Sequence, residues 1–341
     1  MLGAVTYSEG SPCPALVLDA RQLPSAKDAL VQALGGVWRR LEHLGAARIL
    51  KIALIAPSPD PAAELDYRFV QVLPGRPPEF DLRGTCGHAL LGALLTARRW
   101  GWLAGGRIAV NLPDTAGRFV CEPEEAGRWS ASYTVAFAPG PLPALRQMLL
   151  TPEPVTRLAY GRGTVEVSLV AAGNPYVFVD ARGLRSARHG LLTGRDDVLG
   201  RLREELEAVR AAAATRLGWS EQGAFPKAAV VHASARGRLT VRALSVPSWH
   251  PTMALTGLVC LMAASLIEGT VPYRLARRSG CLPGELVVDT AGGPLRAAAL
   301  VVAGTDRLAW VRVPGKRVQH WGEIPLGPSP LSAAGARHAR L

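Results

Sequence analysis

The chain has 341 residues, 48% hydrophobic and 19% charged, a composition typical of folded protein rather than disordered polymer. No apolar run reaches the roughly 18 residues of a membrane helix, and the start lacks the pattern of a secretion signal, so we expect a soluble cytoplasmic protein with no membrane partner. The net charge is +12, but the arginines are scattered and not interleaved with aromatics, which argues against a nucleic-acid partner. The arginine surplus has two open interpretations, a GC-rich genome or an acidic partner or substrate.

The first half of the chain predicts alternating strands and helices followed by a meander of strands. The apolar residues of 26–45 recur with helical spacing, and the mostly apolar stretch 87–103 predicts a buried helix. The predicted strands of this half cover residues 14–19, 51–56, 67–72, 107–113, 117–123 and 130–137.

The second half predicts the same plan. A long helix is predicted at about 195–217, with glutamates early and arginines late, and a second apolar helix at about 252–267. The predicted strands cover residues 165–181, 228–234, 239–246, 284–290, 295–304 and 308–314.

Three pairs of segments, in the same order in both halves, point to a duplication. PALVLDARQLPSAK from Pro14 returns as PYVFVDARGLRSAR from Pro175, with 7 of 14 positions identical. LKIALIAPS returns as PKAAVVHAS, and GTCGHALLGALL returns loosely as WHPTMALTGLVC. We therefore predict a duplicated α/β fold of the α+β type, in which two pseudo-symmetric lobes each wrap a mixed sheet around one central apolar helix. The predicted lobes are residues 1–160 and 161–326, with a disordered tail over 327–341 and the chemistry in the cleft between the lobes.

The cysteines suggest chemistry rather than cross-linking. They are five in number and form no CxxC pair, which argues against a disulfide framework and a cysteine-rich zinc site. Cys86 lies directly before the first apolar helix, where backbone amides and the helix dipole favour an anion such as a thiolate. The alternative interpretation of this residue is an inert buried cysteine.

Two further residues join Cys86 as candidates. His250 lies at the corresponding place before the second apolar helix, so two helix N-termini would meet at one ligand across the cleft. Lys51 is the only charged residue of an apolar strand, and we expect it to face the cleft and act as a base rather than to point to solvent.

The order of these segments resembles a known family. A strand lysine, DYRFVQV, GTCGH before a helix, AAGNPYVFV, and then LTGLVC and IEGTVP after His250 are similar to the 2-methylaconitate cis-trans isomerase (PrpF-like) family, relatives of diaminopimelate epimerase. The resemblance covers about residues 5–326 and implies a diaminopimelate epimerase-like fold. It also implies that Cys86 and Lys51 form an acid/base pair that moves a proton so that a double bond shifts or changes geometry, with no cofactor and no metal.

From the residues and this resemblance we predict a complete candidate site. The predicted catalytic residues are Cys86, Lys51 and His250, and the predicted substrate-binding residues are Cys13, Gln71, Thr85, Gly87, His88, Gly173, Asn174, Pro175, Thr256 and Ser279.

The chain departs from the family at groups that bind anions. Where the family carries an RGGTSKG segment for substrate carboxylates, residues 9–15 read EGSPCPA, and the acidic residue before AGNP is Ala171. GNCGN has become GTCGH. We therefore expect a less charged, unsaturated acyl or carboxylate substrate, and one hypothesis is an acyl chain on an acidic acyl carrier protein in secondary metabolite biosynthesis.

Other functions stay open at this stage. A small di- or tricarboxylate isomerase or tautomerase would need cleft arginines, for which Arg48, Arg68 and Arg83 are available. The presence of His250 in place of a second cysteine argues against a racemase or epimerase. A cysteine hydrolase would use Cys86 with His88 or His250. A catalytically inactive binding protein is the alternative from another class, and both a monomer and a homodimer are compatible with the sequence.

Overall fold

The computed structural model describes residues 1–114, 117–161, 163–189, 191, 194, 196–234, 237–245 and 248–328. The chain divides into two compact units, one of Met1–Thr134 with Gly315–Leu341 and one of Val135–Pro314. These boundaries differ from the predicted lobes, because residues 135–160 belong to the second unit and residues 315–326 to the first. The repeat in the sequence carries no sign that residues 315–326 return to the first unit. Residues 329–341 of the predicted tail lie outside the described residues.

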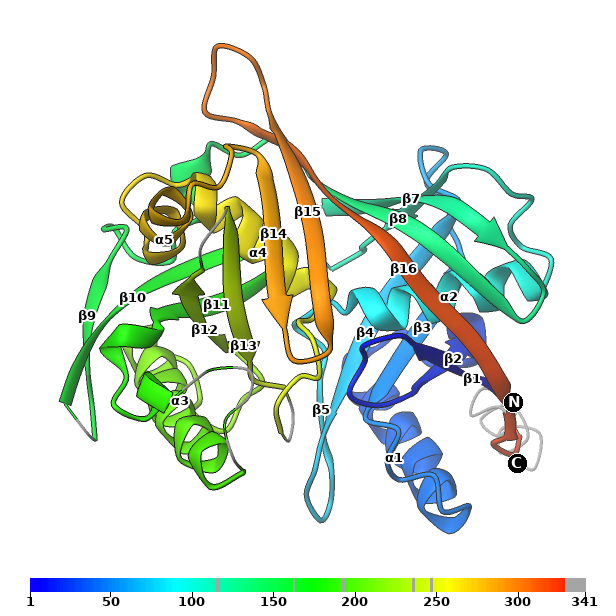
Figure 1. Ribbon diagram of the computed structural model, residues 1–341. Coiled ribbons are helices and arrows are strands. Elements are labelled where there is room, and N and C mark those ends of the chain that lie inside the picture. The colour runs from blue at the N-terminus through cyan, green and yellow to red at the C-terminus, as the bar shows by residue number, and fades with distance from the viewer. Residues whose placement is uncertain are drawn as a thin grey trace. The chain divides into compact units, whose positions relative to one another are not determined.

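The sheet of the first unit is mixed and curves around a helix (Figure 1). The central strands follow the order β1-β2-β3-β4-β6-β7-β8, and β2 and β3 are parallel. The strands are β1 (Leu2–Ser8), β2 (Ala15–Asp19), β3 (Lys51–Pro57), β4 (Leu65–Leu73), β5 (Glu79–Asp81), β6 (Ile108–Asn111), β7 (Gly117–Ala126), the first part of β8 (Ser130–Pro139) and the last part of β16 (Leu308–Pro325).

Two helices cover opposite faces of this sheet. The amphipathic α1 (Lys27–His43) packs its apolar side onto alternate residues of the strands, among them Leu16, Ile52 and Leu54. The helix α2 (Gly87–Arg99) is buried on every side from Gly87 to Ala97, as expected for the predicted central helix, and it contacts β1, β2 and β3. The other alternate residues of the strands, which include Thr6 and Lys51, therefore face α2.

Close packing between α2 and β1 depends on Gly92. A Cβ atom added to this residue would overlap the hydroxyl of Thr6 and lie 3.1 Å from its Cβ. We expect Gly92→Ala to lower the free energy of unfolding by about 1–3 kcal/mol, because neither the buried strand nor the buried helix has room to move. Urea unfolding measures the change. Gly35→Ala in α1, where the added methyl group meets only the end of Arg39 at 3.8 Å, is the matched control and should stabilise by about 0.5–1 kcal/mol. An equal effect of the two substitutions would contradict the prediction.

The second unit repeats the arrangement around its own apolar helix (Figure 1). Its helix α4 (Leu255–Leu266) is buried from Leu255 to Ala264 and contacts β10, β11 and β15. The long helix α3 (Asp196–Arg216) packs against β9 and β12, and α5 (Val271–Ser279) follows α4. The strands are the end of β8, β9 (Thr156–Tyr160), β10 (Gly163–Ala172), β11 (Asn174–Asp180), β12 (Lys227–Ala233), β13 (Arg238–Ala243), β14 (Glu285–Thr290), β15 (Gly293–Val301) and the first part of β16.

The predicted duplication is visible in matching details of the two units. In each, a strand runs into a short 3₁₀ helix, a long helix follows, and the next strand pairs in parallel with the first, giving β2-α1-β3 and β11-α3-β12. Asp19 and Asp180, from the repeated DAR motif, cap the two 3₁₀ helices by accepting from the backbone N–H groups of Arg21 and Arg182, both at 3.0 Å. The predicted mixed α/β architecture is thus confirmed.

No single helix of the described chain combines the length and apolar character needed to cross a membrane. The pair α4 and α5 passes the test together by length and composition only, with a bend of 78° between them.

Candidate active site

Lys51 occupies the first position of β3 and is buried on the side of the sheet that faces α2. Its amine donates a hydrogen bond of 2.8 Å to the hydroxyl of Ser11, in the loop between β1 and β2. The Ser11 hydroxyl in turn donates to the backbone carbonyl of Cys13 at 2.8 Å. The lysine is therefore held by the segment that replaces the RGGTSKG sequence of the resembling family.

Cys86 is the residue that precedes the first turn of α2. Its backbone is extended, and its side chain makes no capping hydrogen bond to the helix. Its carbonyl oxygen accepts two hydrogen bonds, one from the hydroxyl of Tyr67 at 2.8 Å and one from the N–H of Leu90 at 2.9 Å. The sulfur is thus carried on a backbone held from two sides, at the end of the helix where the dipole favours negative charge.

The Cys13 thiol lies within electrostatic reach of both Lys51 and Cys86. Burial raises the pKa of Cys13 above its usual value, the Lys51 ammonium opposes this shift, and Cys86 adds to it. Burial also raises the pKa of Tyr67 well above its usual value, so this hydroxyl stays protonated and acts as a hydrogen-bond donor. The structure of the first unit therefore gathers an amine and two thiols around the start of α2.

The other predicted residues of the first unit occupy this same region with different contacts. Thr85 and His88 flank Cys86 and Gly87 and are buried, and the carbonyl of His88 accepts from Ser8 at 2.7 Å. Gln71, opposite Lys51 on β4, uses its amide N–H groups to donate to the carbonyls of Leu50 at 2.9 Å and Val72 at 3.1 Å. The bond to Leu50 ties Gln71 to the start of β3, directly beside Lys51.

In the second unit, the structure brings three of the predicted residues together before α4. The side-chain amide of Asn174 donates to the hydroxyl of Thr256 at 2.9 Å, and Gly173, at φ 78°, approaches the same threonine. Pro175 follows in β11, and the buried Ser279 ends α5. This cluster holds the start of β11 against the first turn of α4.

His250 is buried in the segment that leads to α4. Its Nδ1 accepts a hydrogen bond from the backbone N–H of Thr252 at 3.2 Å, so in the neutral imidazole the proton sits on Nε2. In this state the ring offers a donor rather than a base. That His250 faces Cys86 across a cleft stays a prediction.

A sequence family described as PrpF protein matches residues 144–299, within the second unit. YraM of Bacillus subtilis is 24% identical over 80% of this chain and 86% of its own length, and its name describes it as an isomerase. The 3-methylitaconate isomerase of Eubacterium barkeri is 25% identical over 71% of this chain and 74% of its own length. A crystal structure of methylitaconate-delta-isomerase has the same fold, with a TM-score of 0.65 and 20% identity over 95% of both chains.

The chain is thus similar to PrpF proteins, with the family match confined to residues 144–299. The comparisons agree with the resemblance seen in the sequence, and the mixed α/β fold that it implied is confirmed. The roles of the site residues are proposals for this chain.

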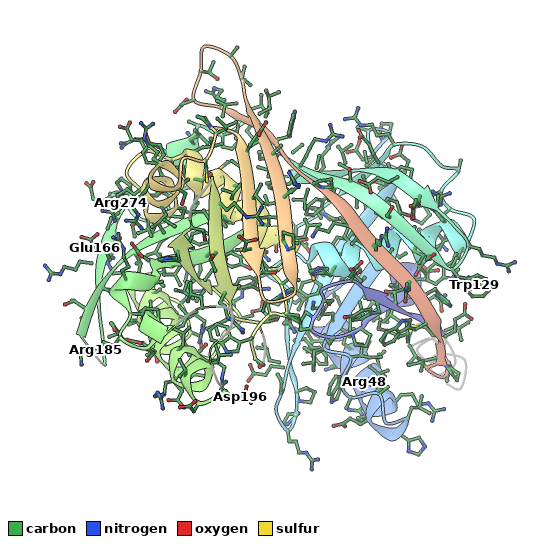
Figure 2. The ribbon with its side chains drawn as sticks, viewed as in Figure 1. Arg48, Trp129, Glu166, Arg185, Asp196 and Arg274 are labelled. Atoms are coloured by element: carbon green, nitrogen blue, oxygen red, sulfur yellow. The ribbon has the colours of Figure 1, made fainter. Side chains whose placement is uncertain are left out.

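The arginines that a small-acid substrate would need are paired with carboxylates or exposed in this chain. Arg68 pairs with Asp114 at 2.6 Å, and Arg83 pairs with Asp81 at 2.6 Å. Arg48 is exposed on the connection between α1 and β3 (Figure 2). Two of the three candidates thus have their charge already matched by a carboxylate.

Sequence reasoning missed a second buried lysine of the first unit. Lys316 on β16 is 8% exposed, and burial lowers its pKa to about 8, although the carboxylate of Glu9 opposes the shift. The predicted strand ended at Pro314, so this residue lay beyond it. In the structure, buried Lys316 and Val318 alternate with exposed Arg317 and Gln319, a pattern that the charge of Lys316 hides in the sequence.

The lowered pKa of Lys316 makes the stability of the protein depend on pH in a specific window. In the folded state Lys316 is protonated only below about pH 8, whereas in the unfolded chain it stays protonated up to about pH 10.5. The free energy of unfolding therefore increases as the pH rises from about 8 to about 10.5. Below pH 8 the buried charge costs roughly 3 kcal/mol.

We expect Lys316→Met to be more stable than the wild type at pH 7 by up to this amount, with the difference disappearing as the pH approaches 10.5. Urea unfolding of both proteins from pH 6.5 to 10.5 measures it. A difference that does not change with pH would contradict the assignment.

Proposed function

We propose that this protein is a cofactor-independent isomerase that moves a proton to shift or cis-trans isomerise a carbon–carbon double bond next to a carboxyl or acyl carbonyl. The observation that carries the proposal is the grouping of the Lys51 amine with the thiols of Cys13 and Cys86 at the start of α2. The named relatives, including a 3-methylitaconate isomerase, support the reaction class.

The reaction needs one group that removes a proton from carbon and one that returns a proton elsewhere on the conjugated system. Lys51 and Cys86 are the proposed pair. A carbon acid next to a conjugated carbonyl gives a dienolate when it loses its proton, and negative charge builds up on the carbonyl oxygen. The amides of the first turn of α2, after Cys86, point in the direction that stabilises such an oxyanion.

Burial of both groups supports the same chemistry. Lys51 is 5% exposed and Cys86 4%, so little water reaches them. Exclusion of water during the reaction strengthens every interaction with the developing charge and protects the dienolate from side reactions. The Ser11 hydroxyl fixes the lysine, and Tyr67 fixes the backbone of Cys86.

Proton exchange tests the proposal directly. The protein is incubated in D₂O with 3-methylitaconate, with aconitate-like acids, and with unsaturated acyl chains either free or bound to an acidic acyl carrier protein. NMR and mass spectrometry then follow deuterium at carbon. An isomerase incorporates deuterium and changes the double bond of at least one compound without a covalent enzyme adduct. A trapped acyl-enzyme on Cys86 would instead indicate a hydrolase, and binding without exchange would indicate an inactive binding protein.

A further inference from the structure

The last strand of the chain brings Lys316 to the end of the first-unit sheet where α2 begins. β16 pairs antiparallel with β1, with Ser8 opposite Val318, and the N–H of Glu9 donates to the carbonyl of Arg317 at 3.0 Å to extend the ladder. Lys316 therefore lies opposite the loop that follows β1, the loop that also holds Ser11.

The side chain of Lys316 lies on the α2 side of the sheet. Residues directly opposite each other in an antiparallel pair share a face, and so do residues two apart on one strand. Ser8 faces α2, because its hydroxyl donates to the carbonyl of His88. Val318 shares that face with Ser8, and Lys316 shares it with Val318; both are buried, while Arg317 between them is exposed.

Successive contacts along β1 place Lys316 at the level of the helix N-terminus. Thr6 lies against Gly92, and Ser8, two residues on, lies against His88, one helical turn nearer the start of α2. A further step of two residues along the ladder, a distance of about 7 Å, reaches the level of Lys316 and passes the first residue of the helix. Cys86 occupies that end of α2, and Lys51 starts its strand on the same face.

The charge of Lys316 is uncompensated at close range. Among the residues that the structure describes, Lys316 makes no hydrogen bond and has no carboxylate within ion-pair distance, and Glu9 acts on it only as a more distant charge. Arg21, Arg68 and Arg83 in the same unit are each paired with an aspartate. A buried ammonium without a partner is costly, so a site for an anion at this place would repay the cost.

We propose that Lys316 and the N-terminus of α2 bind a carboxylate of the substrate, with Lys316 supplying the positive charge that the EGSPCPA segment no longer carries. That the bound carboxylate belongs to the substrate rests on the proposed function. Binding of an anion at this site, in contrast, does not require that the protein be an isomerase. The ligand is a short organic acid with one carboxylate at this point, and the double bond lies toward Lys51 and Cys86.

Binding of saturated acids tests the proposal separately from catalysis. Isothermal titration with methylsuccinate, butyrate and glutarate, none of which has a double bond to move, gives affinities for the wild type and for Lys316→Met. We expect roughly 10- to 100-fold weaker binding in Lys316→Met, the usual loss for one charged hydrogen bond. Lys316→Arg, which keeps the charge, should retain binding to within about threefold of the wild type.

Two controls separate a bound anion from a structural role. Arg317→Met removes one positive charge from the exposed face of the same strand and should leave affinity unchanged. Glu9→Gln should leave affinity unchanged or strengthen it, because Glu9 repels a bound carboxylate. Equal weakening by Lys316→Met and Arg317→Met, unchanged affinity in Lys316→Met, or no binding of any of the three acids to the wild type would each overturn the proposal. Binding that depends on Lys316 in a protein without deuterium exchange would refute the proposed isomerase and leave the anion site standing.

Discussion

Replacing Cys86 by serine is expected to lower the rate of proton exchange by about three orders of magnitude while leaving the fold intact. A serine hydroxyl is too weak an acid to exchange protons with a carbon acid near neutral pH, and general acid–base groups contribute roughly 100- to 10,000-fold. The substitution exchanges sulfur for oxygen in a side chain that makes no capping bond, so α2 and its contacts remain. Deuterium incorporation into the best substrate, with the thermal unfolding midpoint as the check on folding, measures both effects.

Cys13→Ser is the matched control for this experiment. Cys13 lies within electrostatic reach of Lys51 and Cys86, but burial keeps its thiol protonated, and its carbonyl rather than its sulfur receives the Ser11 hydroxyl. We expect a change of less than about tenfold, far below the effect at Cys86. A larger loss of activity in Cys13→Ser than in Cys86→Ser would contradict the assignment and make Cys13 the acid/base residue.

Replacing Lys51 by methionine should reduce exchange by a similar factor, roughly 1,000-fold, because it removes the second partner of the acid/base pair. Methionine fills the same buried space at the start of β3 and leaves no unpaired charge. Lys51→Arg keeps a positive charge near Ser11 but holds its proton too tightly to act as a base. If the Lys51 amine transfers the proton, both Lys51→Met and Lys51→Arg should therefore be inactive.

The arginine variant distinguishes catalysis from positioning. If Lys51 only attracts an anionic substrate, Lys51→Arg should keep most of the turnover and a near-normal KM, whereas a proton-transferring amine loses kcat in both variants. Ser11→Ala separates the holding bond from the amine itself: we expect a moderate loss of about tenfold, because the hydroxyl only orients the lysine. Full activity of Lys51→Met would end the proposed mechanism.

The sequence contained most of the fold because its signals were local and repeated. The DAR motifs predicted two equivalent strand ends, and both aspartates cap the same kind of 3₁₀ helix. The apolar stretches after Cys86 and His250 predicted helices without a polar face, and both are buried cores of their units. The hydrogen bond from Lys51 to Ser11 was not predictable, because it joins residues 40 positions apart through the order of three strands.

Two elements that were not predicted from the sequence, the second part of β16 and the helix α5, also have physical explanations. Pro314-Gly315 reads as a turn, but the strand continues through it, with Gly315 at φ 66°, and the second part of β16 reaches β1. The helix α5 went unpredicted because polar residues dominate it, although Thr270 caps it by accepting from the N–H of Tyr273 and Pro272 lies in its first turn.

The pairing of β1 with β16 ties the order of synthesis to the order of assembly. Leu2–Ser8 are made more than 300 residues before their neighbours Val318–Pro325, so the nascent chain carries an open β edge while the intervening residues are translated. Contacts of such sequence separation close slowly and leave an aggregation-prone intermediate. A chain released before residue 316 would lack both the strand that covers β1 and the buried Lys316, so the closing of this sheet edge and the proposed anion site depend on the same segment.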